Sequence, residues 1–161
     1  MQLRGTDLVL DEVRARKHVN SGSGATLGIS ALDSGSLTLL DRAAGIVVTL
    51  PVATSATIGM FFDFAVLTTV TTNAYKVITG AATEFLIGSY MSVDTDTSNV
   101  GLTMVGNGTS HIAVNMTAAS SNALGGIQGT TLRFTCLSTT RWSVRGVVHC
   151  AGTPATAFSA S

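Results

Sequence analysis

The segment TLRFTCLSTTRWSVRGVVHC, residues 131–150, is the stretch that decides the fold of this chain. It reads as two strands, residues 131–137 and 141–150, joined by the short polar linker 138–140. Alternating apolar and polar side chains place every second residue on one face of a strand, and a short linker closes two such strands into a hairpin. The pairs expected on its buried face are Leu132 with Gly146, Phe134 with Val144, and Cys136 with Trp142.

This register keeps the two cysteines of the chain apart. Cys136 lies near the turn and Cys150 at the far end of the hairpin, separated by roughly 26 Å of ladder at about 3.3 Å per residue. A disulfide requires Cα atoms about 4.4–6.8 Å apart. We therefore predict two free thiols, and this agrees with synthesis in a cytoplasm, where thiols stay reduced.

The same strand-forming composition is found throughout the chain from residue 25. Thr, Val, Ile and Ser dominate, glycines recur at short intervals, and no window has a sustained helical period. The expected strands are residues 25–30, 36–40, 45–50, 59–70, 75–79, 85–91, 100–105, 111–116, 131–137 and 141–150. Short strands at about ten-residue spacing are typical of an antiparallel sandwich or jelly roll. The predicted fold class is all-β, with an antiparallel β-sandwich or jelly-roll-like body over residues 25–150.

The N-terminal residues 1–24 differ from this body. A charged segment gives way to NSGSG, residues 20–24, which has the composition of a flexible linker. We interpret residues 1–24 as an extended arm with a hinge, whose Arg14, Arg16 and Lys17 contact a partner. The alternative is a frayed terminus with an unimportant charge cluster.

The C-terminal residues 151–161, AGTPATAFSAS, are small and polar apart from one bulky side chain, Phe158. We expect an extended tail. It either docks on a neighbouring molecule with Phe158 as its anchor or is disordered.

Charge and hydropathy exclude two classes of partner. The formal net charge is +0 and only 11% of the residues are charged, whereas nucleic-acid binding needs a clustered positive field. The most apolar run, residues 58–70, contains Asp63 and is shorter than the roughly 20 residues of a membrane-spanning helix. We therefore expect no nucleic acid and no membrane as partner. Because 45% of the residues are hydrophobic, we expect a subunit interface to cover part of the surface.

Catalytic and metal-binding patterns are sparse. The histidines His18, His111 and His149 have no carboxylate or nucleophile at a spacing that suggests a catalytic dyad, and the chain has few acidic residues from which to build one. DTDTSN, residues 94–99, has the alternating oxygens of a calcium loop but lacks the glycine and the final glutamate, so we interpret it as a polar turn. The sequence predicts no enzyme activity, no cofactor and no metal.

Two phrases resemble small virion proteins of tailed bacteriophages. LDRAAGIVVTLP, residues 40–51, is similar to a phrase near the start of those proteins, in which a turn leads into a strand that ends in Leu-Pro. RWSVRG, residues 141–146, followed by AGTPATAF, residues 151–158, is similar to their closing strand and tail, with Ala157 at a position where that tail has proline. The resemblance spans residues 31–158 and identifies the chain with the capsid decoration, or cement, proteins.

The resemblance implies a structural, non-enzymatic protein on the capsid surface of the virion, made in the host cytoplasm. Its expected partners are the major capsid protein and further copies of itself, as a homo-oligomer and most simply a homotrimer. The expected capsid contacts lie in the arm and tail, at Arg14, Arg16, Lys17 and Phe158. The alternative is a phage tail or fibre module that binds a host surface glycan. A small glycan-degrading enzyme is a third reading, disfavoured because carboxylates and aromatic side chains are scarce.

Overall fold

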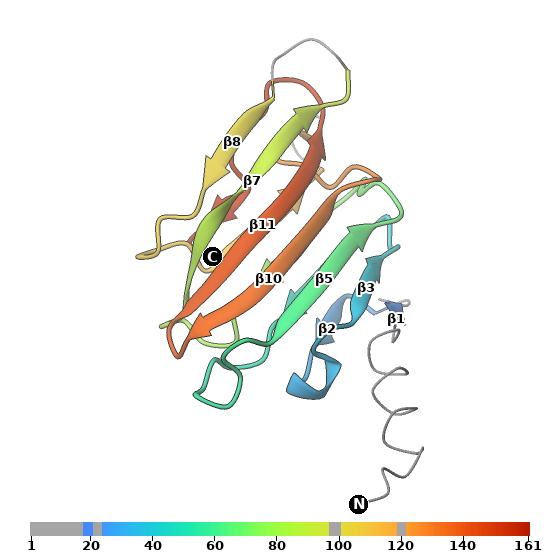
Figure 1. The fold of residues 1–161 in the computed structure, drawn as a ribbon. Coiled ribbons are helices and arrows are strands. Elements are labelled where there is room, and N and C mark those ends of the chain that lie inside the picture. The colour runs from blue at the N-terminus through green and yellow to red at the C-terminus, as the bar shows by residue number, and fades with distance from the viewer. Residues whose placement is uncertain (1–17, 21–23, 97–100, 119–121) are drawn as a thin grey trace, which may run out of the picture.

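The fold is a sandwich of two β-sheets, seen in a computed structural model that describes residues 18–20, 24–96, 101–118 and 122–161 (Figure 1). The larger sheet has seven strands in the order β1-β3-β5-β10-β11-β7-β8, and the smaller has five in the order β12-β9-β6-β4-β2. The strands are β1 His18–Asn20, β2 Thr26–Gly28, β3 Leu37–Leu40, β4 Ile46–Thr49, β5 Phe61–Val66, β6 Ala74–Ile78, β7 Phe85–Asp94, β8 Leu102–Val105, β9 Ala113–Thr117, β10 Thr131–Ser138, β11 Arg141–Cys150 and β12 Phe158–Ser159. A 3-10 helix, η1, covers Ala31–Asp33.

The predicted all-β sandwich is confirmed, and so is the hairpin from which it was argued. β10 and β11 pair antiparallel with Leu132 opposite Gly146, Phe134 opposite Val144, and Cys136 opposite Trp142. Each strand expected from the sequence overlaps a strand of the structure. The two short strands β1 and β12 were not expected.

Both sheets are mixed, so the expectation of a purely antiparallel sandwich was wrong in this respect. Half of the ten strand pairings are parallel: β1 with β3, β3 with β5, β2 with β4, β4 with β6, and β7 with β11. The cause is the path of the chain, because consecutive strands from β2 to β7 alternate between the two sheets. A strand and its next-but-one neighbour then enter the same sheet in the same direction.

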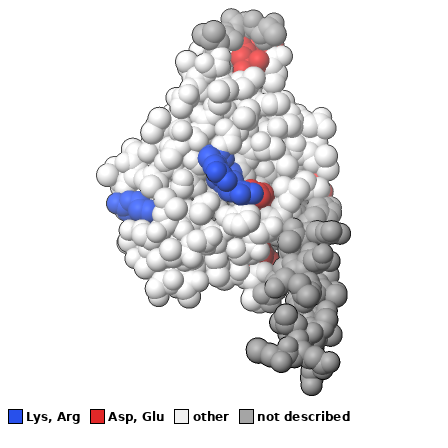
Figure 2. All heavy atoms as spheres, viewed as in Figure 1, with Lys and Arg blue, Asp and Glu red and all other residues white. Residues whose placement is uncertain are grey.

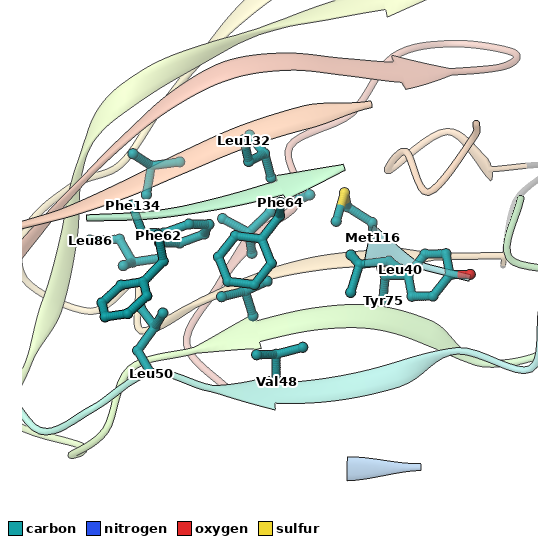
Figure 3. Close-up of a cluster of buried hydrophobic side chains, with 14 of the residues drawn as sticks. Leu40, Val48, Leu50, Phe62, Phe64, Tyr75, Leu86, Met116, Leu132 and Phe134 are labelled. Carbon is teal, nitrogen blue, oxygen red and sulfur yellow. The ribbon is translucent and has the colours of Figure 1, made fainter. Parts of the chain in front are cut away.

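The core fills the space between the sheets. Phe62 and Phe64 from β5, with Phe134 from β10, face Val48 and Tyr75 from the smaller sheet (Figure 3). The Phe64 and Phe134 rings meet edge-on, with centroids 5.4 Å apart, a preferred geometry for aromatic pairs. Trp142 is completely buried, as the sequence pattern predicted.

The LDRAAG phrase forms the corner that carries the chain from β3 in one sheet to β4 in the other. The Gly45 N–H donates to the Arg42 carbonyl over 2.8 Å, and the Arg42 guanidinium donates to the Gly45 carbonyl over 2.6 Å. Gly45 has a φ of 81°, and a Cβ there would lie 2.4 Å from the Ala74 carbonyl oxygen. Only glycine fits, because this corner needs both the left-handed backbone and the close approach.

The C-terminal tail packs on its own domain rather than extending away from it. β12 pairs antiparallel with β9, and the Phe158 ring lies 5.1 Å from that of Tyr90 and 5.5 Å from that of His111. The Ala157 N–H also donates to the Tyr90 hydroxyl over 2.6 Å. Burial of this ring and completion of the smaller sheet explain why the tail departs from the extended segment that its polar composition suggested.

The N-terminal arm is described only in part. His18–Asn20 forms β1 and pairs in parallel with Leu37–Leu39 at the edge of the larger sheet. This end of the predicted arm therefore belongs to the sandwich. Residues 1–17 and the hinge residues 21–23 lie outside the described residues.

Candidate functional site on the outer face of the larger sheet

The outer face of the seven-stranded sheet is broad and nearly uncharged (Figures 1 and 2). Figure 2 shows one basic patch beside a single acidic patch near its middle, surrounded by uncharged side chains. Exposed apolar residues surround this centre on several strands: Leu37 on β3 is 39% exposed, Met91 on β7 53% and Val105 on β8 63%. Contiguous exposed apolar patches are typical of interaction sites.

The charged residues at the centre are placed by the strand register. Asp63 on β5 lies opposite Arg133 on β10, and Arg133 lies opposite Arg145 on β11. The row continues to Leu37 on one side and Ser89 on the other. One acidic and two basic side chains therefore stand next to one another across three adjacent strands.

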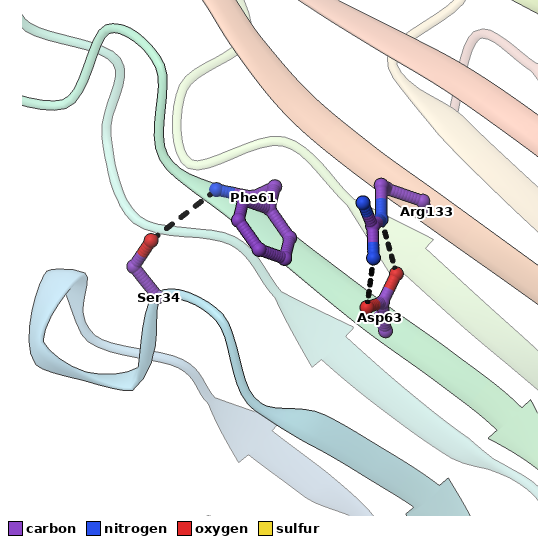
Figure 4. Close-up of polar contacts among 4 residues, drawn as sticks. All are labelled: Ser34, Phe61, Asp63 and Arg133. Carbon is purple, nitrogen blue, oxygen red and sulfur yellow. Dashed lines mark hydrogen bonds and ion pairs between the residues drawn. The ribbon is translucent and has the colours of Figure 1, made fainter. Parts of the chain in front are cut away.

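Arg133 and Asp63 form a complete ion pair (Figure 4). Nε and Nη2 of Arg133 donate to the two carboxylate oxygens of Asp63, each over 2.6 Å. The hydrogen bonds that it donates to Asp63 raise the pKa of the Arg133 guanidinium above its ordinary value. The same guanidinium lies over the Phe61 ring, 4.3 Å from its centroid. Both carboxylate oxygens of Asp63 are thus engaged by Arg133 in a bidentate arrangement.

Arg145 is the unpaired member of the row. It is exposed, and the described residues give it no hydrogen bond, ion pair or ring contact. Its cross-strand neighbours are Arg133, which has the same charge, and Ser89. Like charges directly opposite one another on a sheet destabilise it, so the fold itself gives no reason for a cation at this position.

A shallow hollow of about 540 Å³ lies beside Arg145. Its lining residues are Leu37, Asp63, Phe64, Thr131, Leu132, Arg133, Arg145 and Gly146. At Gly146 the strands run so close that a Cβ would lie 2.1 Å from the Thr131 carbonyl oxygen. The absence of a side chain at Gly146 thus keeps β10 and β11 together beneath the hollow. The hairpin register predicted from the sequence already implies that Arg133 lies opposite Arg145. Nothing in the sequence indicated that Asp63 joins them, because β5 meets β10 only through strand pairing.

None of the contact residues predicted from the sequence belongs to this row of charged side chains. Arg14, Arg16 and Lys17 fall outside the described residues. Phe158 is only 5% exposed and belongs to the core, so its side chain is already in use within its own domain. The expectation that Phe158 anchors a neighbour is therefore at odds with the structure: anchoring would require the tail to leave this position.

The polar groups most capable of chemistry have structural partners. Glu84 is buried and its two oxygens accept from the Ala53 N–H over 2.7 Å and from Trp142 Nε1 over 2.9 Å. The ring of His111 lies parallel to that of Phe158, and its Nδ1 accepts from the Asn107 N–H over 3.1 Å. The sequence gave no hint of the role of Glu84, which depends on two partners far along the chain.

Neither a metal-binding cluster nor a membrane-spanning helix occurs in the described part of the chain. Within residues 18–20, 24–96, 101–118 and 122–161, no three His, Cys, Asp or Glu side chains lie close enough together to hold a metal ion. In the loop predicted to be a polar turn, Asp96 Oδ2 accepts from the Gly152 N–H and its own N–H donates to Asp94 Oδ1. No helix in the described ranges has the length and apolar character needed to cross a bilayer.

The fold and this face define a two-sheet β-sandwich with a wide, nearly neutral surface. No protein-family model, curated protein or solved structure matches the chain.

Proposed function

We propose that this chain is a structural virion protein that binds the outside of a tailed-phage capsid and stabilises the shell. The observation that carries the proposal is the outer face of the larger sheet, which presents exposed apolar side chains together with Arg145, a cation that no described residue pairs with. Such a surface suits a permanent protein–protein contact, in which apolar area supplies affinity and a few polar groups fix the register. The resemblance of residues 31–158 to capsid decoration proteins points to the same role.

Binding to an intact shell stabilises it by linkage, because the bound protein favours the assembled state over the dissociated one. Many equivalent copies on a symmetric shell also allow modest individual contacts to act together. We propose that the chain acts as a homo-oligomer, a trimer at the positions where three capsomers meet, and that it has no enzymatic role.

The glycan-binding alternative receives less support from the aromatic residues. A sugar-binding face normally presents aromatic rings to solvent, but every Phe, Tyr and Trp of the chain falls within the described residues and most are buried. The two exceptions are half-buried beneath arginines: Phe61 under Arg133 at 4.3 Å and Phe85 under Arg141 at 5.2 Å. One face of each of these rings is therefore covered by a guanidinium.

Particles with and without the chain test the proposal. Electron microscopy of the complete particles should place the chain on the outer surface of the shell, and particles lacking it should keep their shape but release DNA at a lower temperature. Light scattering of the purified chain should give the mass of a trimer. Density for the chain in the tail, or equal release temperatures for the two kinds of particle, would favour the tail-module alternative.

A further inference from the structure

Among the described residues, the row Asp63–Arg133–Arg145 has an unbalanced charge. Asp63 neutralises Arg133 through two hydrogen bonds, and Arg145 stands opposite Arg133 with no acceptor in the described part of the chain. The same face of the sheet presents Leu37, Met91 and Val105. A face with exposed apolar side chains thus holds one guanidinium that no described residue neutralises.

Covering this surface with a purely apolar partner would be unfavourable. A guanidinium removed from water without an acceptor loses its hydration and gains nothing in return. A partner that binds here must therefore bring an acceptor to Arg145. The five N–H donors of arginine form a planar fork that matches a carboxylate in a bidentate arrangement.

The surroundings favour a protein carboxylate over a nucleic-acid phosphate. A phosphate backbone carries a charge every few ångströms and needs several cations along its path. Here Arg145 is flanked on one side by Arg133, whose charge Asp63 already neutralises, and on the other side by the uncharged Ser89. The hollow beside Arg145 also has apolar lining from Leu37, and this suits a side chain that projects from a protein surface.

We infer that Arg145 is the recognition residue of the outer face and that it binds an Asp or Glu side chain projecting from an apolar patch of the partner protein. Under the proposed function, on which this inference rests, that partner is the shell subunit. Arg133 is a positioning residue. Because it is paired with Asp63, Arg133 leaves Arg145 as the guanidinium that donates hydrogen bonds to the incoming carboxylate.

Charge reversal gives the first test, using particles that lack the chain and the purified full chain added back. Arg145→Glu should weaken binding at least about thirtyfold, the effect typical of an interface hot spot. Lys76→Glu is the matched control. It makes the same charge change on β6 in the other sheet, and it should bind like the wild type. Equal melting temperatures of the free variants would show that both are folded.

The outcomes separate the inference from the proposed function. If the wild-type chain binds the particles and Arg145→Glu binds equally well, the inference is overturned and the proposed function stands. If the wild-type chain does not bind at all, both are overturned. If Lys76→Glu is weakened as much as Arg145→Glu, the effect is one of overall charge, and the assignment to Arg145 is again overturned.

A second test identifies the group that meets this position. Arg145→Lys keeps the positive charge and introduces a primary amine that a carbodiimide joins to a touching carboxylate as an amide, with loss of water to the reagent. Mass spectrometry of the cross-linked particles should find position 145 joined to an Asp or Glu of the shell subunit. Cross-links from position 145 only to another copy of this chain, or only to its own residues 1–17, would overturn the assignment of the partner.

Discussion

Replacing Glu84 with glutamine should destabilise the sandwich although it removes only a charge. Both carboxylate oxygens of Glu84 accept from N–H donors, one from the Ala53 backbone and one from the Trp142 indole. An amide has a single oxygen, so in either orientation its NH2 group must face one of these N–H groups. With a side chain that is only 1% exposed, water cannot supply the missing acceptor.

The expected loss follows from these two contacts. A hydrogen bond to a charged group contributes about 1.5–3 kcal/mol, and an unsatisfied buried donor costs about 1–3 kcal/mol. Relief from burying the charge offsets part of this, so we expect Glu84→Gln to cost about 2–4 kcal/mol. At about 2–4 °C per kcal/mol for a domain of this size, the melting temperature should fall by roughly 5–12 °C.

Trp142→Phe is the second substitution of a double-mutant cycle, in which thermal and urea denaturation measure the free energy of unfolding of each variant. Without the indole N–H, the amide of Glu84→Gln can turn its oxygen to Ala53 and its NH2 group toward the vacated space. The two losses should therefore be less than additive, by about 1–2 kcal/mol. Wild-type stability of Glu84→Gln, or strict additivity of the two substitutions, would refute the idea that this carboxylate links the Ala53 backbone to the Trp142 indole.

The remaining predictions concern the tyrosines, the tail and the thiols. Burial raises the pKa of Tyr75 to about 12 and also raises that of Tyr90. The free energy of unfolding should therefore fall above pH 10, because the tyrosines of the unfolded chain ionise first. In a spectroscopic titration of the folded protein, formation of tyrosinate by these residues at the ordinary pKa of 10 would contradict this. Phe158→Ala should cost about 3 kcal/mol in denaturation experiments because a ring is removed from the core, whereas unchanged stability would mean that the tail does not pack as described. Cys136 and Cys150 are free and buried, so a thiol reagent should modify them rapidly only in denaturant, and fast reaction in the native state would count against their burial.

Local patterns in the sequence predicted much of this fold. The alternation in β10 and β11 determines which side chains face the core, and a three-residue linker leaves little freedom in register, so the hairpin and the burial of Trp142 were predictable. Alternation does not reveal which strand lies alongside. The parallel pairing of β7 with β11, which sets Phe85 beside Arg141, depends on contacts between distant parts of the chain.

The contact between Asp63 and Arg133 in the candidate site could not be predicted from local sequence patterns for the same reason. Asp63 and Arg133 lie far apart in sequence and meet only because β5 pairs with β10. The tail shows a related limit, since β12 has two residues and no alternation to detect. Its position is determined by the rings of Tyr90 and His111, which receive Phe158.

The place of the β10–β11 hairpin in the larger sheet has a consequence for how the protein is made. These strands come late in the chain but lie at the centre of the sheet, between β5 and β7. On the ribosome, β5 and β7 emerge first and have no partner for their facing edges until residue 150 has been synthesised. Unpaired strand edges are the parts of a nascent chain most prone to aggregate. The chain through residue 150 must therefore leave the exit tunnel before the larger sheet can close, and a chain truncated before Arg141 would expose the edge of β7 that β11 normally covers.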